Sequence, residues 1–220
     1  MSKNAVIFDL DGTLLDTLDD LTNAVNYFLE SHGYPSIAKK TVRSYLGNGA
    51  AHLIKSAMPE TVDDETFAKY VAEYAEYYRA HSSIETKPYD GVLDVLKELK
   101  SDGISVAVVS NKPDPSVKVL CRQYFGELVD FSVGDRPDIA RKPSADPVIL
   151  ATKELGCERA VFVGDSEVDV LTANNAGMPC VSLTWGFRDR DVLEECGALH
   201  FADDAEELKE QIYRLLGKGE

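Results

Sequence analysis

Short apolar runs of strand length alternate with amphipathic stretches along most of the chain. Residues 5–8, 106–109 and 161–163 are three such runs. From Pro88 onward, segments whose apolar positions have helical spacing separate each run from the next. This alternation of strand and helix is the signature of an α/β fold with a doubly wound, Rossmann-like parallel sheet.

The expected elements of this sheet can be placed along the chain from the same pattern. After the first run, strands are expected near 106–109, 131–133, 161–163, 180–183 and 200–202, and helices near 92–100, 116–124, 146–155, 168–175 and 206–216.

Between the first two strands the periodicity is helical throughout, from about Leu18 to about His81. Leu21, Val25 and Leu29 share one helix face. We therefore expect an all-helical insert, residues 17–82, in a core domain formed by 1–16 and 83–220. The tyrosines of 70–78 could stack on a base or sugar, but core packing at helical spacing is the favoured interpretation.

Composition narrows the class of protein. The chain of 220 residues has a formal net charge of −15, which argues against an extended nucleic-acid surface but leaves room for a small anionic ligand. The four cysteines are widely spaced and are expected to be reduced thiols. With no apolar run of bilayer length and no signal-peptide pattern at 1–4, we expect no membrane partner and a cytoplasmic location.

The most informative polar residues follow the first strand directly. Asp9 and Asp11 are expected to point to the same side of the chain, and Gly12 permits a sharp turn after them. Two carboxylates in one pocket repel each other, which favours either an acid/base pair or a metal site.

Three further polar signals occur later in the chain. Ser110-Asn111-Lys112 and Gly164-Asp165 each follow an apolar run, and Lys142-Pro143 precedes an amphipathic segment. The carboxyl ends of parallel strands meet at one edge of a sheet, so we expect all of these residues to form a single site. Pro143 biases Lys142 toward an extended conformation at a strand end.

The order of these four motifs resembles that of the haloacid dehalogenase superfamily of phosphohydrolases, across essentially the whole core. The resemblance implies an enzyme in which Asp9 is the nucleophile that forms an aspartyl-phosphate. It implies that Asp11 protonates the leaving oxygen and later activates water. Dehalogenases of this type lack the second aspartate, so Asp11 favours phosphate chemistry.

The same resemblance implies a Mg²⁺ cofactor and a set of phosphate-binding residues. The expected metal ligands are side-chain oxygens of Asp9 and Asp165 and the main-chain carbonyl of Asp11, with Asp169 behind them orienting water or Lys142. The expected phosphate-binding groups are Gly12, Thr13, Ser110, the amide of Asn111, and Lys142, which neutralises charge.

The helical insert resembles the mobile cap of this superfamily, and its loop Gly47-Asn48-Gly49 resembles the substrate-specificity loop of phosphoglycolate phosphatases. A glycine turn that opens a helix presents backbone N–H groups to a carboxylate, and Arg43 is placed to assist. The alternative is that the two glycines only end one helix and begin another.

We therefore predict hydrolysis of a small phosphorylated metabolite, with 2-phosphoglycolate favoured. Pyrophosphate, nucleoside monophosphates and sugar phosphates are alternative substrates on the same core. A sugar-phosphate mutase is disfavoured because Leu21 stands where such mutases carry a histidine. A non-catalytic phosphate sensor and a flavodoxin-type redox protein are weaker alternatives, and the protein is expected to be a monomer or a homodimer.

Overall fold

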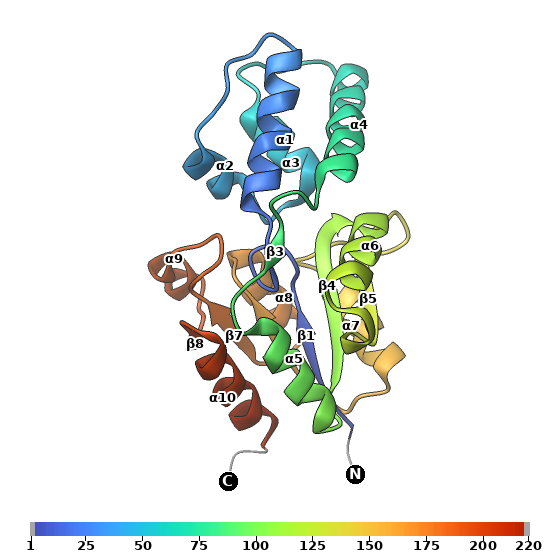
Figure 1. Ribbon diagram of the computed structural model, residues 1–220, viewed down its shortest axis with the longest axis vertical. Coiled ribbons are helices and arrows are strands. Elements are labelled where there is room, and N and C mark those ends of the chain that lie inside the picture. Colours follow the sequence, from blue (N-terminus) through green and yellow to red (C-terminus); the bar gives the residue numbers. More distant parts are fainter. Residues whose placement is uncertain (1–2, 218–220) are drawn as a thin grey trace.

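A computed structural model describes residues 3–217 as a parallel sheet flanked by helices, with a helical unit at one end (Figure 1). The strands of the main sheet lie in the order β5-β4-β1-β6-β7-β8, and every neighbouring pair is parallel. These strands are β1 (Asn4–Phe8), β4 (Ser105–Pro113), β5 (Phe131–Asp135), β6 (Arg159–Gly164), β7 (Cys180–Leu183) and β8 (His200–Ala202). The expected α/β fold class is confirmed.

Alternating side chains of the central strands divide the core into two layers. Val6 and Phe8 point to one face of the sheet, while Ala5 and Ile7 point to the other. The first face is covered by α5 (Val92–Ser101), α6 (Asp114–Tyr124) and α10 (Ala205–Leu216), and the second by α7 (Asp146–Leu155) and α8 (Glu167–Asn175). No helix within residues 3–217 is both long and apolar enough to cross a bilayer.

The segment between Asp16 and Lys87 folds into four helices that share a hydrophobic cluster of their own. Leu21, Val25 and Leu29, the face expected from the sequence, are all buried in it. This helical unit stands over the carboxyl ends of the strands (Figure 1). Its helices are α1 (Leu18–Ser31), α2 (Lys39–Tyr45), α3 (Gly49–Ala57) and α4 (Asp64–His81).

The chain crosses between the core and the helical unit twice, and the two crossings are tied together. A two-stranded antiparallel pair joins β2 (Leu15–Asp16) to β3 (Lys87–Pro88). Beside it the buried carboxylate of Asp20 accepts hydrogen bonds from the backbone N–H groups of residues 84–86, at 3.0–3.2 Å, and from the Thr86 hydroxyl at 2.7 Å. A carboxylate with this many donors fixes the returning chain against the start of α1.

The structure differs from the sequence expectation mainly in short elements. Residues 18–81 are not helical throughout, because loops at 32–38, 46–48 and 58–63 separate the four helices. The short strands β2 and β3, the helix α9 (Arg190–Glu195) and the 3₁₀ turn at Gly126–Leu128 were not expected. Elements of two to six residues are too short for a periodic pattern to show.

The domain boundaries 16/17 and 82/83 stay predictions.

We predict that Gly91→Ala destabilises the protein more than Gly103→Ala, although both glycines adopt positive φ, of 78° and 70°. That conformation should cost a residue with a Cβ about 1–2 kcal/mol at either position. A Cβ at Gly91 would also lie 2.5 Å from the Cβ of Ala205, whereas one at Gly103 meets no atom within 4 Å. Overpacking should add about 1–3 kcal/mol at Gly91 alone.

Urea unfolding of both variants measures this difference. Equal losses of unfolding free energy would contradict the close approach of α5 and α10 at this point.

Candidate active site

Parallel register brings the polar ends of three strands to the same edge. Phe8 of β1 pairs with Val108 of β4 on one side and with Val163 of β6 on the other. Asp9 therefore emerges between Ser110 and Asp165, and its backbone N–H continues the ladder to the carbonyl of Val163 at 2.9 Å. All three side chains are buried. The structure thus brings together the motifs that the sequence placed at one sheet edge.

Lys142 supplies positive charge behind Asp9. Its Nζ lies 2.8 Å from Asp9 Oδ1 and 2.7 Å from Asp169 Oδ1, and the lysine side chain is 2% exposed. Burial alone would lower the pKa of Lys142, but the charges of Asp169 and Asp9 outweigh it and hold the pKa above its usual range. Lys142 comes from the loop between β5 and α7, where its peptide bond to Pro143 is cis, and not from a strand end as expected.

Asp165 is held by donors on both oxygens. The Thr13 hydroxyl donates to Oδ1 at 2.7 Å, and the backbone N–H of Phe187 donates to Oδ2 at 2.7 Å. Gly12 makes room for this carboxylate, because a Cβ there would lie 2.4 Å from Asp165 Oδ2. Gly12 and Thr13 therefore border the carboxylate cluster.

Asp169 lies one helical turn beyond Asp165 and is fully buried. Its Oδ2 accepts hydrogen bonds from the backbone N–H groups of Asp165 and Ser166, at 3.2 and 3.0 Å, and from the Ser166 hydroxyl at 2.6 Å. Its Oδ1 accepts from Lys142. Both oxygens are therefore occupied by the protein, as expected for a residue that orients the lysine.

The carboxylates of this cluster outnumber its cations. Asp9, Asp165 and Asp169 each place an oxygen within 4.8 Å of the others, and Lys142 is the lysine among them. Burial raises the pKa of Asp9 to about 6, an effect that Lys142 partly offsets. Burial and the charges of Asp169 and Asp9 raise the pKa of Asp165. This excess of buried oxygen ligands with negative charge fits a hard divalent cation such as Mg²⁺.

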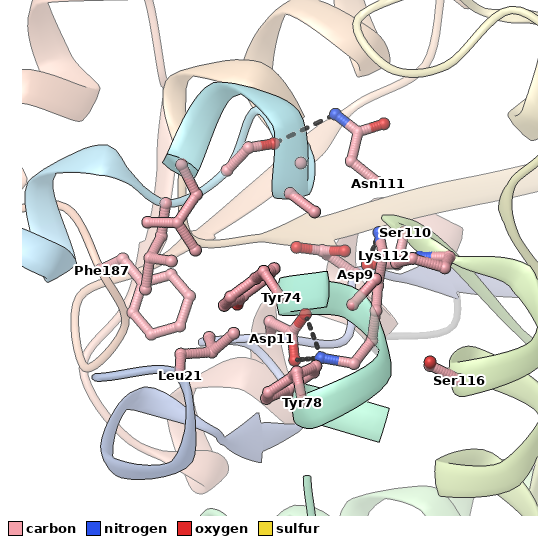
Figure 2. A pocket seen from close by; sticks show the side chains of 17 residues that line it. Asp9, Asp11, Leu21, Tyr74, Tyr78, Ser110, Asn111, Lys112, Ser116 and Phe187 are labelled. Atoms are coloured by element: carbon pink, nitrogen blue, oxygen red, sulfur yellow. Dashed lines mark hydrogen bonds and ion pairs between the residues drawn. The ribbon is translucent and has the colours of Figure 1, made fainter. Parts of the chain in front are cut away.

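A second buried lysine contacts Asp11. Lys112 Nζ donates to both carboxylate oxygens of Asp11, at 2.9 Å each, and to the hydroxyl of Tyr78 at 2.6 Å (Figure 2). The sequence analysis gave Lys112 no role. Strand alternation could have placed Lys112 in the site, because residues 110 and 112 of one extended segment point to the same side. The tyrosine partner lies on α4, far away in sequence.

A cavity lies between this sheet edge and the helical unit. Figure 2 shows Asp9, Asp11, Ser110 and Lys112 gathered on one side, with Leu21, Tyr74 and Phe187 on the other. The remaining lining residues are mostly small or apolar, namely Leu46, Gly47, Gly49, Ala50, Leu53, Ala75, Tyr78, Asn111, Pro113 and Ser116. Tyr74 and Tyr78 belong to the buried cluster of the helical unit, in agreement with the packing interpretation of this stretch.

The loop between α2 and α3 is pinned to the core from two sides. The guanidinium of Arg188 donates to the carbonyls of Arg43 at 3.2 Å and Leu46 at 2.7 Å, and it also pairs with Glu167. The side-chain amide of Asn111 donates to the carbonyl of Gly47 at 3.0 Å and to that of Lys142 at 3.0 Å. The side-chain nitrogen of Asn111 therefore joins the loop to the core, while its buried Oδ1 has no hydrogen-bond partner in the described part of the chain.

Two residues expected near the substrate lie elsewhere. The Arg43 guanidinium donates to the Gly186 carbonyl at 2.9 Å and to the Asp189 carboxylate at 3.0 Å, so it joins the helical unit to the core and does not line the cavity. Asn48 precedes α3 and is also not among the lining residues, whereas its neighbours Gly47 and Gly49 are.

Comparison with known proteins identifies the family to which the chain belongs. The model for haloacid dehalogenase-like hydrolases matches residues 6–183. The chain is 37% identical to phosphoglycolate phosphatase 1 of Pseudomonas aeruginosa, over 88% of this chain and 74% of the relative. It is 35% identical to the phosphoglycolate phosphatase of Neisseria meningitidis serogroup A, over 87% of this chain and 84% of that protein.

Solved structures agree with the sequence relatives. A predicted phosphoglycolate phosphatase from Haemophilus somnus superposes with a TM-score of 0.87 at 27% identity, covering 96% of this chain and 99% of that one. A Lactobacillus delbrueckii subsp. bulgaricus protein, provisionally described as a phosphoglycolate phosphatase, reaches a TM-score of 0.90 at 35% identity, over 96% of this chain and 99% of that one.

The chain therefore belongs to the haloacid dehalogenase-like hydrolases. Within that family it is a phosphatase, similar to the proteins named phosphoglycolate phosphatase. This confirms the resemblance on which the sequence analysis relied.

We predict that Mg²⁺ stabilises the protein through the carboxylate cluster. At a concentration about 100 times its Kd, Mg²⁺ should raise the Tm of the wild type by roughly 5–10 °C. The rise should be nearly lost in Asp165→Asn, which removes one anionic ligand, and retained in Glu210→Gln, an exposed carboxylate on α10. Thermal unfolding of each variant with and without Mg²⁺ gives the comparison. A full-sized rise in Asp165→Asn would place the metal elsewhere.

We also predict that Arg188→Lys loosens the helical unit. A lysine keeps the charge beside Glu167 but cannot reach two carbonyls with one planar fork. Amide hydrogen exchange over residues 39–57 should accelerate by about tenfold, the equivalent of about 1.4 kcal/mol of lost local stability. Arg190→Lys is the matched control, because the ion-pair and ring partners of Arg190 within residues 3–217 lie in the core and its side chain is half exposed. Unchanged exchange in Arg188→Lys would show that the fork does not hold the loop.

Proposed function

We propose that the protein is a Mg²⁺-dependent phosphomonoester hydrolase that acts on 2-phosphoglycolate through an aspartyl-phosphate. The observation that carries this proposal is a single cavity lined by Asp9, Asp11 and Ser110 and closed by the cap, the helical unit α1–α4. A nucleophile, a proton donor and phosphate-binding groups are what ester cleavage requires, and here they share one enclosed space.

The reaction divides into two displacements on phosphorus. An oxygen of Asp9 attacks the phosphorus while Asp11 gives a proton to the leaving alkoxide, so that glycolate departs and the phosphoryl group stays on Asp9. Asp11 then takes a proton from water, whose oxygen attacks the same phosphorus and releases phosphate with the Asp9 carboxylate restored. The burial of Asp9 among other carboxylates keeps its nucleophilic oxygen free of bulk water.

Side-chain oxygens of Asp9 and Asp165 and the main-chain carbonyl of Asp11 are the groups proposed to hold Mg²⁺. When bound, the ion supplies positive charge that stabilises the transferring phosphoryl group. Thr13 and Asp169 keep Asp165 and Lys142 in place, as their hydrogen bonds indicate.

The phosphate itself is proposed to lie against β4 and the turn after β1. The Ser110 hydroxyl and the Asn111 backbone amide are its donors, and Gly12 lets the chain turn close to it. Lys142 neutralises charge on Asp9 and on the phosphate, for which its buried position within 2.8 Å of Asp9 is suited.

Substrate choice is proposed to lie with the cap. Gly49 and Ala50, the first residues of α3, line the cavity, so the positive end of this helix is available to a carboxylate. The apolar walls formed by Leu21, Tyr74 and Phe187 suit a small leaving group better than a sugar or nucleoside with many hydroxyls. Leu21 also offers no proton-transfer group, which disfavours a mutase.

The names of the relatives support the same substrate, since those cited above with 35–37% identity are phosphoglycolate phosphatases. Pyrophosphate, nucleoside monophosphates and sugar phosphates stay as alternatives with the same core chemistry. A cytoplasmic location, the absence of nucleic-acid and membrane partners, and a monomeric or dimeric state stay predictions from the sequence.

A phosphate-release assay tests the proposal. With Mg²⁺ present we expect kcat/KM for 2-phosphoglycolate to exceed that for pyrophosphate, adenosine monophosphate and glucose 6-phosphate by at least about tenfold, or about 1.4 kcal/mol of transition-state binding. Chelation should abolish release. Asp9→Asn should lower kcat at least about a thousandfold, as expected for loss of a covalent nucleophile, while Glu210→Gln keeps wild-type activity. If the preferred substrate has no carboxylate, the assignment of 2-phosphoglycolate is wrong, but the proposed core chemistry is unaffected.

A further inference from the structure

We infer that Lys112 has two alternating partners: it pairs with Asp11 in the empty site and with the carboxylate of the substrate in the filled one. This inference rests on the proposed function and deepens it by assigning the substrate's second anionic group to a named side chain.

The first observation is that Lys112 is buried with all of its donors occupied. The residue is 6% exposed, and its ammonium group has three N–H donors. Two are directed at Asp11 Oδ1 and Oδ2, and the third at the Tyr78 hydroxyl. A lysine held only by Asp11 and a neutral phenol can exchange the carboxylate for another one without becoming an unpaired buried charge.

The second observation concerns which cations reach the cavity. Lys112 is the sole lysine, arginine or histidine among the described residues that line it. Lys142 lies behind Asp9 and is shared with Asp169, while Arg43 and Arg188 are bound to the junction between cap and core. A substrate that carries both a phosphate and a carboxylate brings a second negative charge into a space with apolar walls. Lys112 is the cation available to compensate it.

The exchange would also free Asp11. Asp11 lines the cavity, but while both of its oxygens accept from Lys112 they are occupied and do not contact an incoming ester. A substrate carboxylate that draws the ammonium aside leaves these oxygens available to the bridging oxygen of the substrate. Recognition of the carboxylate would thus place the second aspartate for its part in the reaction, and an ester without that group would leave Asp11 paired.

Tyr78 provides a fixed point for this movement. It lies on α4 of the cap, whereas Lys112 lies on β4 of the core, so their hydrogen bond spans the two parts of the molecule (Figure 2). Burial raises the pKa of Tyr78, which keeps the phenol neutral and able to accept from the ammonium. The lysine can therefore change its carboxylate partner while its contact with the closed cap persists.

The test compares two inert ligands by calorimetry in the presence of Mg²⁺. 3-Phosphonopropionate has a methylene in place of the ester oxygen of 2-phosphoglycolate, and propylphosphonate has a methyl group in place of its carboxylate. The wild type should bind the first more tightly by about tenfold or more, the contribution of one charge-assisted hydrogen bond. In Lys112→Met this preference should fall below about threefold while the affinity for propylphosphonate stays within about threefold of the wild-type value.

Lys112→Arg, which keeps the charge, should retain part of the preference, and Lys97→Met, an exposed lysine on α5, should retain all of it. An undiminished preference in Lys112→Met, or an equal loss of affinity for both ligands, would overturn the inference and leave the proposed function intact. Equal binding of both ligands by the wild type would instead overturn the choice of 2-phosphoglycolate, and the inference with it.

A structure of the wild type with 3-phosphonopropionate decides the matter even if Lys112→Met does not fold. Lys112 Nζ should then lie within hydrogen-bond distance of the ligand carboxylate and no longer bridge both oxygens of Asp11. A ligand carboxylate bound only by the backbone of α3 would contradict the exchange.

Discussion

The crowding of carboxylates around one lysine is the constraint on which the site depends. Asp9, Asp165 and Asp169 are buried together, and Lys142 compensates only part of their charge. Such a cluster is tolerated because backbone amides, a threonine and a serine donate to its oxygens, and those donors come from three separate segments of the core. The fold therefore accepts an electrostatic cost at the sheet edge, a cost that a bound divalent cation would relieve.

The two buried lysines of the site have different surroundings. Lys142 is enclosed by carboxylates that hold it in place, whereas Lys112 faces the cavity and touches the cap. One lysine thus lies inside the core, and the other lies where the core, the cap and the cavity meet. A family that varies its substrates while keeping its chemistry can do so by changing residues of the second kind.

Much of this could be predicted from the sequence, because the governing signals are local. Apolar runs located the strands, and a parallel sheet necessarily gathers Asp9, Ser110 and Asp165 at one edge. The partners of Arg43, Lys112 and Arg188 could not be predicted, since each contact joins segments that are adjacent only after the cap has folded. The role of Asp20 could not be predicted for the same reason. Its carboxylate accepts hydrogen bonds from the backbone of residues 84–86, more than sixty positions later in the chain.

Asp20 has a mechanical consequence. Because it fastens the returning chain to the start of α1, beside the paired strands β2 and β3, the two connections between cap and core behave as one ribbon. A ribbon bends readily across its plane but resists twisting and sliding, so any swing of the cap is restricted to nearly a single axis. Such a hinge would return Tyr78 to the same place above β4 each time the cap closed, so that the Tyr78–Lys112 contact would re-form without a change of register.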